Sequence, residues 1–278
     1  MKKKPVIWVN CLVKNEERWI WYGLNSVLPF VDKVIVWDTG SKDLTQKIIK
    51  TVKSKKANFL SVGEVGKKDF GKLRQKMLEQ TSSDWVWILD GDEVWPRESV
   101  IKLISAVEKA PLSIQSFCVR PINFVGDIRF IHPETFSGKT PHGPEGLKGF
   151  FSTRIFRRNI PGLHVKNEYG KEAFFDKNEV TLRKRKGHVQ YLPDVYYWHL
   201  SYLLRSSSRI KDRQVMMRQK KRKYEIGLKR PYWMKIPEVF FSSRPKIVPD
   251  PFYKMSLGEY FKAFIQTPLK KIKRKLLN

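Results

Sequence analysis

The feature that most constrains this chain is a short apolar run, residues 85–89, which ends in three carboxylates, Asp90, Asp92 and Glu93. A short apolar run bounded by a turn residue predicts a buried strand of a parallel sheet. Open α/β sheets place their ligands at the C-terminal ends of such strands. Carboxylates this close together repel one another unless a cation or hydrogen-bond donors satisfy them. The segment therefore indicates either a divalent cation beside phosphate oxygens or a solvated acidic turn after an ordinary strand.

Strand-like and helix-like segments alternate before this run. The strand-like segments are residues 6–13, 34–37 and, more weakly, 58–62. Helical spacing of apolar residues follows each of them, over residues 16–28, 44–52 and 70–80. This alternation predicts βαβ units and a parallel sheet with right-handed crossovers. The glycine-rich signatures of dinucleotide-binding and P-loop proteins are absent from the sequence, which disfavours both classes.

Four motifs, in their order and spacing, resemble the family 2 glycosyltransferases. They lie at residues 13–17, 36–45, 69–75 and 89–93. The resemblance is closest to the bacterial branch that assembles lipopolysaccharide cores and other glycans. It implies a GT-A fold, a nucleotide-diphosphate-sugar donor and a divalent metal, Mg²⁺ or Mn²⁺. One departure is Gln75, where the family usually has Asn after the arginine.

The expected fold class is therefore α/β, a GT-A domain with a Rossmann-like, mostly parallel sheet flanked by helices. We expect this domain over residues 1–202, followed by a basic helical extension over residues 203–278. A chain of 278 residues can form one α/β domain of this size with additions.

The resemblance places the nucleotide at the first two strand ends. Asp38 ends the second strand and would contact the base or ribose; its alternative role is to cap the next helix. Asn15 and Glu16 follow the first strand and would line the same pocket, or simply cap a helix. Arg74 would lie near the diphosphate, which suits its planar guanidinium, and is otherwise a solvated cation.

The metal site is expected at the acid-tipped strand. Asp92 is the candidate for direct metal contact, while Asp90 and Gly91 would reach the ribose, with Asp90 also a candidate metal ligand. The metal would screen the charge of the diphosphate leaving group. His199 follows an aromatic run and resembles the late histidine that completes the metal site in many GT-A enzymes. Its alternative is an ordinary core or surface histidine.

The general base is the least determined residue. An inverting transfer needs a base within hydrogen-bond reach of the acceptor hydroxyl. Residues 154–168 resemble a family element that ends in Gly-x-x-His-Glu, with two extra residues between His164 and Glu168. This favours Glu168 as the base, with Glu145 as the rival, and either is alternatively a solvated loop acid.

Charge is concentrated near the C-terminus. The net charge is +28, and from residue 201 onward 21 Lys and Arg stand against 5 Asp and Glu, a net charge of +16. The tail from Phe252 mixes aromatic and aliphatic residues with a terminal basic cluster, and we expect Pro268 to divide it into two short helices. Such a tail suits an anionic membrane surface, although a solvated tail and a nucleic-acid surface are alternatives. No nucleic-acid-binding motif supports the last option.

The cysteines and the lengths of the apolar runs indicate the cellular compartment. Cys11 and Cys118 lie in apolar strand-like runs, which predicts buried thiols in a reducing compartment. No run approaches the roughly 18 apolar residues that span a bilayer. These patterns favour a cytoplasmic protein, with peripheral attachment at the inner face of the membrane as an option.

Taken together, the sequence predicts a metal-dependent inverting glycosyltransferase of cell-envelope glycan biosynthesis. It would move a sugar from a nucleotide-diphosphate donor to a glycan or lipid-linked acceptor, with no specific nucleic-acid partner. The alternative is a catalytically degenerate GT-A-like module that binds nucleic acid or membrane through its basic surface.

Overall fold

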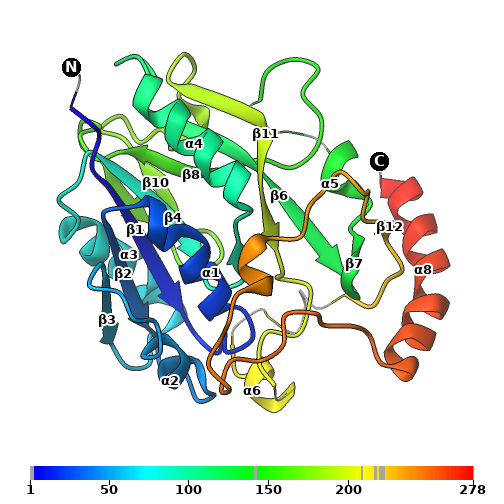
Figure 1. Cartoon of the computed structure of the whole chain (residues 1–278). Helices are drawn as coiled ribbons and strands as arrows, with labels where there is room; N and C mark the ends of the chain where they lie inside the picture. Colours follow the sequence, from blue (N-terminus) through cyan, green and yellow to red (C-terminus); the bar gives the residue numbers. More distant parts are fainter. Residues whose placement is uncertain are drawn as a thin grey trace.

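A computed structural model describes residues 3–138, 140, 143–207, 209–215, 218 and 223–277 (Figure 1). One ten-stranded sheet organises the molecule, in the order β12-β7-β6-β8-β4-β1-β2-β3, with β11 beside β6 and β5 beside β11. Its strands are β1 (Ile7–Val13), β2 (Lys33–Asp38), β3 (Ala57–Ser61), β4 (Trp85–Asp90), β5 (Glu93–Val94), β6 (Ser116–Val125), β7 (Asp127–Ile131), β8 (Ser152–Arg157), β11 (Val189–His199) and β12 (Leu228–Lys229). A separate antiparallel pair is formed by β9 (His164–Lys166) and β10 (Ala173–Phe175).

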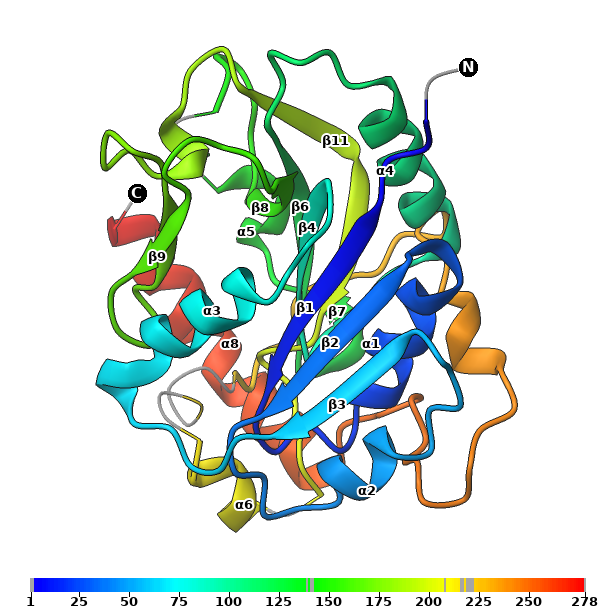
Figure 2. The same ribbon diagram turned by 90° about the vertical axis from the view of Figure 1, so that its left-hand side faces the viewer.

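The first half of the sheet is parallel and carries helices on both faces. Strands β3, β2, β1 and β4 pair in parallel, joined by α1 (Ile20–Val27), α2 (Thr45–Ile49) and α3 (Phe70–Glu79). Successive side chains of a strand point to opposite faces. Val34 and Val36 accordingly pack in the cluster that contains α1, whereas Ile35 and Trp37 pack against α3. Figure 2 shows α1 and α3 on the two sides of the sheet.

The second half of the sheet is mixed. Strand β8 runs antiparallel between β4 and β6, and β11 then lies parallel to β6. Helix α4 (Arg97–Lys109) packs against β11. Large aromatic side chains fill this region: Trp95 lies between Trp87 and Tyr197, and Trp198 contacts Phe124. The predicted α/β class is confirmed, with the parallel ladder in the N-terminal half.

Residues after 202 pack against the rest of the protein. Met234, Phe240 of η4 (Glu238–Phe241) and Val248 belong to the main hydrophobic core, and Phe240 stacks on Trp19. The first part of the expected basic helical extension lies partly outside the described residues; α6 (Arg209–Arg213) falls within it. The division of the chain at residue 202 stays a prediction.

The C-terminal helix α8 (Leu257–Leu277) is continuous through Pro268, contrary to the expected break. A proline removes one helical hydrogen bond and bends the helix rather than always ending it. Contacts hold α8 on both sides of the proline. Thr267 accepts a hydrogen bond from Ile226 N at 2.8 Å, and Arg274 pairs with buried Glu225. None of the described helices is long and apolar enough to cross a membrane.

The remaining short elements are η1 (Leu28–Phe30), η2 (Lys67–Asp69), α5 (Glu134–Ser137) and η3 (Leu182–Lys184). Cys11 and Cys118 are both buried free thiols, as predicted.

Candidate active site

Predicted site residues meet at one cavity of about 140 Å³. Strands β1 and β4 are parallel neighbours, so the segments that follow them lie at the same edge of the sheet. Six of the predicted residues line the cavity: Glu16, Arg74, Asp90, Gly91, Asp92 and His199. A Cβ atom added at Gly91 would lie 2.6 Å from Glu16 Cγ and 3.1 Å from Val13 Cγ1. Glycine therefore allows the two strand ends to approach this closely.

Asp92 and His199 face each other inside the protein. Asp92 Oδ2 lies 3.8 Å from His199 Nε2. His199 ends β11, where it is paired with Glu93 of β5 and Asn123 of β6. Asn123 Oδ1 lies 2.8 Å from His199 Nδ1. An amide oxygen only accepts hydrogen bonds, so Nδ1 carries the proton in the neutral ring and Nε2 is presented toward Asp92.

This pair fits two ligands of one divalent ion. A carboxylate oxygen and an oriented imidazole nitrogen are suitable donors, and phosphate oxygens of a substrate supply further ligands to Mg²⁺ or Mn²⁺. Within the described residues no group of three or more His, Cys, Asp or Glu side chains forms a metal cage. Asp92 is only 2% exposed, so it lies in the interior.

Asp90 lies between two arginines from opposite halves of the sheet. Its Oδ1 accepts a hydrogen bond from Arg74 NH2 at 3.0 Å, and its Oδ2 lies 3.2 Å from Arg154 NH2. Burial alone would raise the pKa of Asp90, but Arg154 and Arg74 outweigh it and hold the pKa below its usual value. Arg154 also pairs with the fully buried Glu93. Asp90 is therefore a permanently ionised carboxylate.

Two arginines that the sequence did not single out lie in the same cavity. Arg205 pairs with Asp92 and lies 3.3 Å from Glu16 Oε1. Arg218 also binds Glu16 and hydrogen-bonds the backbone oxygen of Lys14 at 2.7 Å. Burial raises the pKa of Glu16 to about 8, although both arginines oppose the shift. Two guanidinium groups therefore lie beside the carboxyl groups of Asp92 and Glu16.

Asp38 and Asn15 are buried beside this cavity but do not line it. Asp38 Oδ1 accepts hydrogen bonds from Gly40 N and Ser41 N at 3.1 and 2.9 Å. Within the described residues, its Oδ2 is buried without a hydrogen-bond partner, as a group awaiting a ligand donor would be. Asn15 has a positive φ of 52° and donates to Lys211 O at 2.8 Å. Asn15 thus shapes the loop after β1.

Neither predicted base candidate lines the cavity. Glu168 is paired with Lys67 at 2.7 Å, and Glu145 is exposed in the loop before β8. Glu172, four residues after Glu168, does line it and lies 3.8 Å from Arg74 Nε. Glu172 lies just beyond residues 154–168, from which the base was predicted, and the loop there has positive φ at Asn167 and Gly170. This irregular backbone prevents sequence spacing from fixing which acid points inward.

The family can now be assigned from comparison with known proteins. The model of the glycosyl transferase family 2 matches residues 11–177, more than half of the chain. This chain belongs to the glycosyl transferase family 2. The assignment confirms the predicted enzyme class, a glycosyltransferase.

Similar proteins match this family 2 glycosyltransferase over part of their length. The SPbeta prophage-derived glycosyltransferase SunS of Bacillus subtilis is 33% identical over 102 residues, which are 36% of this chain and 23% of SunS. TarS 1–349 of S. aureus, whose structure is also known with UDP-GlcNAc, is 20% identical with a TM-score of 0.47, covering 70% of this chain and 60% of TarS. Glucosyl-3-phosphoglycerate synthase of Mycobacterium tuberculosis, in complex with Mn²⁺ and UDP-glucose, is 27% identical with a TM-score of 0.34, covering 43% and 44%.

Proposed function

We propose that this protein transfers a sugar from a nucleotide-diphosphate donor to a hydroxyl group of a glycan or lipid-linked acceptor. The observation that carries the proposal is the convergence of Asp90, Asp92 and an oriented His199 on one cavity at the strand ends. Ligands of α/β sheets bind at this edge. The nucleotide would lie toward Asp38, whose buried Oδ2 suits a base N–H or ribose hydroxyl.

Asp92 and His199 would hold Mg²⁺ or Mn²⁺, with Asp90 close by. The metal would act as a Lewis acid that screens the diphosphate and favours its departure. The chain itself adds cations at the same place. Arg74 and Arg205 present guanidinium groups whose planar fork suits phosphate oxygens.

Donor binding requires Arg205 and Arg218 to move. The cavity of about 140 Å³ is smaller than the roughly 300 Å³ at which small-molecule pockets begin. Both guanidinium groups fill the space beside Asp92 and Glu16. A metal that takes Asp92 would release Arg205 from it, because both positive charges compete for one carboxylate. The released guanidinium is then available to the diphosphate.

Glu172 is the proposed general base. Its side chain is 17% exposed, which leaves it accessible to an acceptor hydroxyl. It lines the cavity beside Asp90 and also faces an adjacent cavity. Glu168 and Glu145 lack this placement. In an inverting transfer Glu172 takes the acceptor proton as the hydroxyl oxygen bonds to the sugar carbon.

Thermal stabilisation by nucleotide diphosphates tests the donor site. Ligands that bind only the folded state raise the melting temperature by mass action. UDP, GDP or TDP with Mn²⁺ should raise the melting temperature of the wild-type chain more than either component alone. Absence of any metal-dependent shift with all three nucleotides would instead favour the degenerate module.

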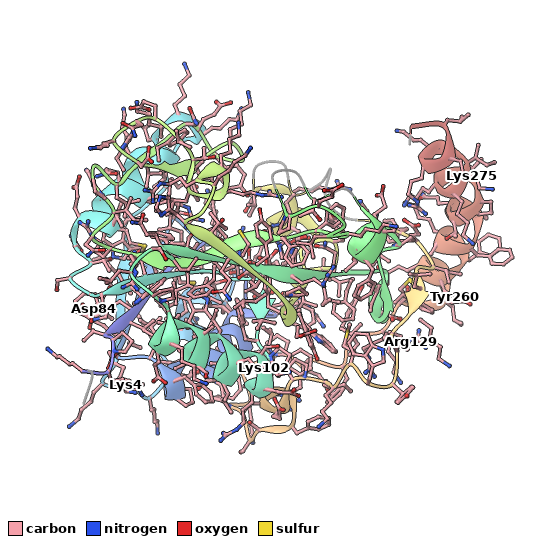
Figure 3. All side chains as sticks on the ribbon, turned by 90° about the horizontal axis from the view of Figure 1, so that it is seen from above. Lys4, Asp84, Lys102, Arg129, Tyr260 and Lys275 are labelled. Atoms are coloured by element: carbon pink, nitrogen blue, oxygen red, sulfur yellow. The ribbon has the colours of Figure 1, made fainter. Side chains whose placement is uncertain are left out.

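We further propose that α8 attaches the enzyme to an anionic membrane surface. Exposed apolar side chains follow one another at helical spacing along it: Leu257, Phe261, Phe264, Ile265, Leu269, Ile272 and Leu276. Exposed lysines flank them at positions 262, 271, 273 and 275. Figure 3 shows Tyr260 and Lys275 at the outer edge of the molecule. The opposite face, with Ala263 and Thr267, is packed on the protein. An apolar stripe between lysines suits the headgroup region of anionic lipid.

Co-sedimentation with vesicles of phosphatidylglycerol and phosphatidylcholine tests this attachment. The triple variant Phe261→Ser/Phe264→Ser/Leu269→Ser should lose most of the vesicle-bound fraction. A matched control is Leu60→Ser/Ile101→Ser/Leu112→Ser, three exposed apolar residues elsewhere. Added salt should weaken wild-type binding, because it screens the attraction between the lysines and the anionic headgroups. Part of the binding should persist at high salt, since apolar burial is not screened. Equal sedimentation of the two variants would exclude α8 as the anchor.

A further inference from the structure

A second cavity, of about 210 Å³, adjoins the donor cavity and shares three of its lining residues, Arg74, Asp90 and Glu172. Its remaining walls include Thr153, Arg154 and Arg183. The two cavities therefore meet at the proposed base. An acceptor hydroxyl that reaches Glu172 from the side opposite the donor would come through this second cavity.

A third cavity, of about 360 Å³, is a neighbour of the second, and the Arg183 side chain lines both. Its wall includes four consecutive cations, residues 183–186, on η3 and the turn after it. The described residues that line it include no Asp or Glu. Gly187, with φ of 78°, allows the turn that follows the four cations. The path from the base thus ends in a strongly positive groove.

One of these four cations forms an ion pair within the described residues, while Arg183 also hydrogen-bonds the Tyr191 side chain and Lys184 and Lys186 are exposed. Arg185 is paired with Asp176 at 2.8 Å. For Arg183, Lys184 and Lys186, by contrast, no ion pair is found in the part of the chain that the structure describes. Arg183 Nε is also buried there without a hydrogen-bond acceptor. A buried donor left unpaired costs free energy, which an incoming oxyanion would recover. A solvated surface run would not bury that N–H.

We propose that these two cavities form an acceptor groove, and that the acceptor carries an anionic group, a phosphate or a carboxylate, near its reacting hydroxyl. This inference rests on the proposed transferase function. The hydroxyl lies at Glu172, and the anion lies at Arg183 and Lys184. In the transfer the acceptor oxygen bonds to the sugar carbon as that carbon's bond to the diphosphate oxygen breaks. The hydroxyl proton goes to Glu172, and the nucleotide diphosphate leaves with the electron pair.

The test compares a groove variant with a control of the same charge change. Arg183→Gln/Lys184→Gln removes two cations from the groove. Lys47→Gln/Lys50→Gln removes two exposed lysines from the region of α2. Calorimetric titration of the full chain, saturated with UDP and Mn²⁺, uses glucose 6-phosphate, glucuronate, inorganic phosphate and glucose as probes. The nucleotide occupies the donor cavity, so these probes report on the groove.

We expect the wild-type and control chains to bind at least one charged sugar about tenfold more tightly than glucose, as one charge-assisted contact allows. The groove variant should bind the charged sugars no better than glucose. The two sugar probes distinguish a phosphate from a carboxylate. Unchanged binding in the groove variant, or equal loss in the control, would overturn the proposal. Tighter binding of inorganic phosphate than of either sugar would also contradict a groove built for an acceptor.

The nucleotide-dependent melting shift, measured on the same samples, separates the two hypotheses. A normal shift with no preference for charged sugars would remove the groove proposal alone. Loss of the shift in the wild-type chain would remove the donor site itself.

Discussion

The two halves of the sheet contribute opposite charges to one site. The parallel half supplies most of the acids, Glu16, Asp90 and Asp92, at or just after the ends of its strands. The mixed half and the segment after it supply most of the cations, Arg154, Arg205 and Arg218. The exceptions are Arg74 of the parallel half, Glu93 of β5, which pairs with β11, and Glu172. Each half alone would bury unpaired charge, which is strongly unfavourable.

This arrangement couples the site to the closure of the fold. Arg205 pairs with Asp92 across 113 positions of sequence, and Arg218 with Glu16 across 202. Glu17 also joins the halves, accepting hydrogen bonds from Leu44 N and Ser206 Oγ at 2.8 and 3.2 Å. The carboxylates of the proposed metal site are thus compensated by arginines in this structure. The comparison predicts that acids and cations respond differently to substitution.

The largest effect on activity is expected at Glu172, an acid that does not come from the parallel half of the sheet. Glu172→Gln should lower the transfer rate about 10²- to 10⁴-fold, because a base acts on the proton in the transition state. Donor affinity, measured by calorimetry, should stay within a few-fold of wild type. Glu168→Gln and Glu145→Gln are matched controls that should retain activity. A loss confined to Glu168→Gln would instead identify Glu168 as the base, as the sequence predicts.

A buried ion pair within the mixed half should have the largest effect on stability. Arg154→Met leaves Glu93 fully buried without its partner, and breaking such a pair costs about 3–5 kcal/mol. Burial favours the neutral form of Arg154, but Glu93 and Asp90 outweigh it and raise the pKa of Arg154 above its usual value. Urea unfolding should show the loss, and Glu93→Gln/Arg154→Met should recover part of it. A single variant as stable as wild type would show that the fold does not depend on this pair.

Removal of Arg205 should change the affinities for the metal and for the donor in opposite directions. Arg205→Gln removes the guanidinium that competes for Asp92. Without nucleotide, Mn²⁺ should bind this variant several-fold more tightly, as seen by electron paramagnetic resonance. The affinity for the nucleotide diphosphate with saturating Mn²⁺ should fall about tenfold, since one charge-assisted contact is lost. Weaker Mn²⁺ binding by this variant, both with and without the nucleotide, would mean that Arg205 supports the metal site.

The smallest effect concerns the pH dependence of stability. Burial raises the folded-state pKa of Glu16 to about 8 from its ordinary value of 4.5. The folded state therefore holds a proton that the unfolded state has lost, and this contribution to stability declines as pH rises between these values. The melting temperature of Glu16→Gln relative to wild type should rise by a few degrees from pH 5 to pH 8. A constant difference would show that Glu16 is ionised throughout.

The sequence predicted the acidic half of the site better than the cationic half. Asp90 and Asp92 follow a buried strand directly, so local pattern and sheet topology together indicate their location. Arg205 and Arg218 belong to a strongly basic region in which sequence cannot distinguish the two inward-facing arginines from solvated ones. Only the packing of that region against β1 and β5 brings them to Asp92 and Glu16.

The fold likewise has elements that local sequence patterns predict and elements that depend on tertiary contacts. Alternating apolar runs predicted β1 to β4 and their helices, because each element satisfies its own periodicity. Pro268 was expected to end a helix from its local chemistry, yet contacts of Thr267 and Arg274 with residues near 225 hold α8 together. Sequence spacing does not indicate that Glu172 lines the cavity, because the loop carries positive φ at Asn167 and Gly170. Tertiary contacts thus overrode local signals where the chain is irregular.

The central claim is that Asp92 joins His199 in a metal site that binds a nucleotide diphosphate. Calorimetric titration of UDP, GDP and TDP into wild-type, Asp92→Asn and His199→Gln chains, with and without Mn²⁺, tests it most directly. Circular dichroism would first establish that each variant is folded. The account predicts metal-dependent binding of at least one nucleotide by the wild type, with a loss of tenfold or more in both variants. Undiminished, metal-dependent binding by Asp92→Asn would contradict it.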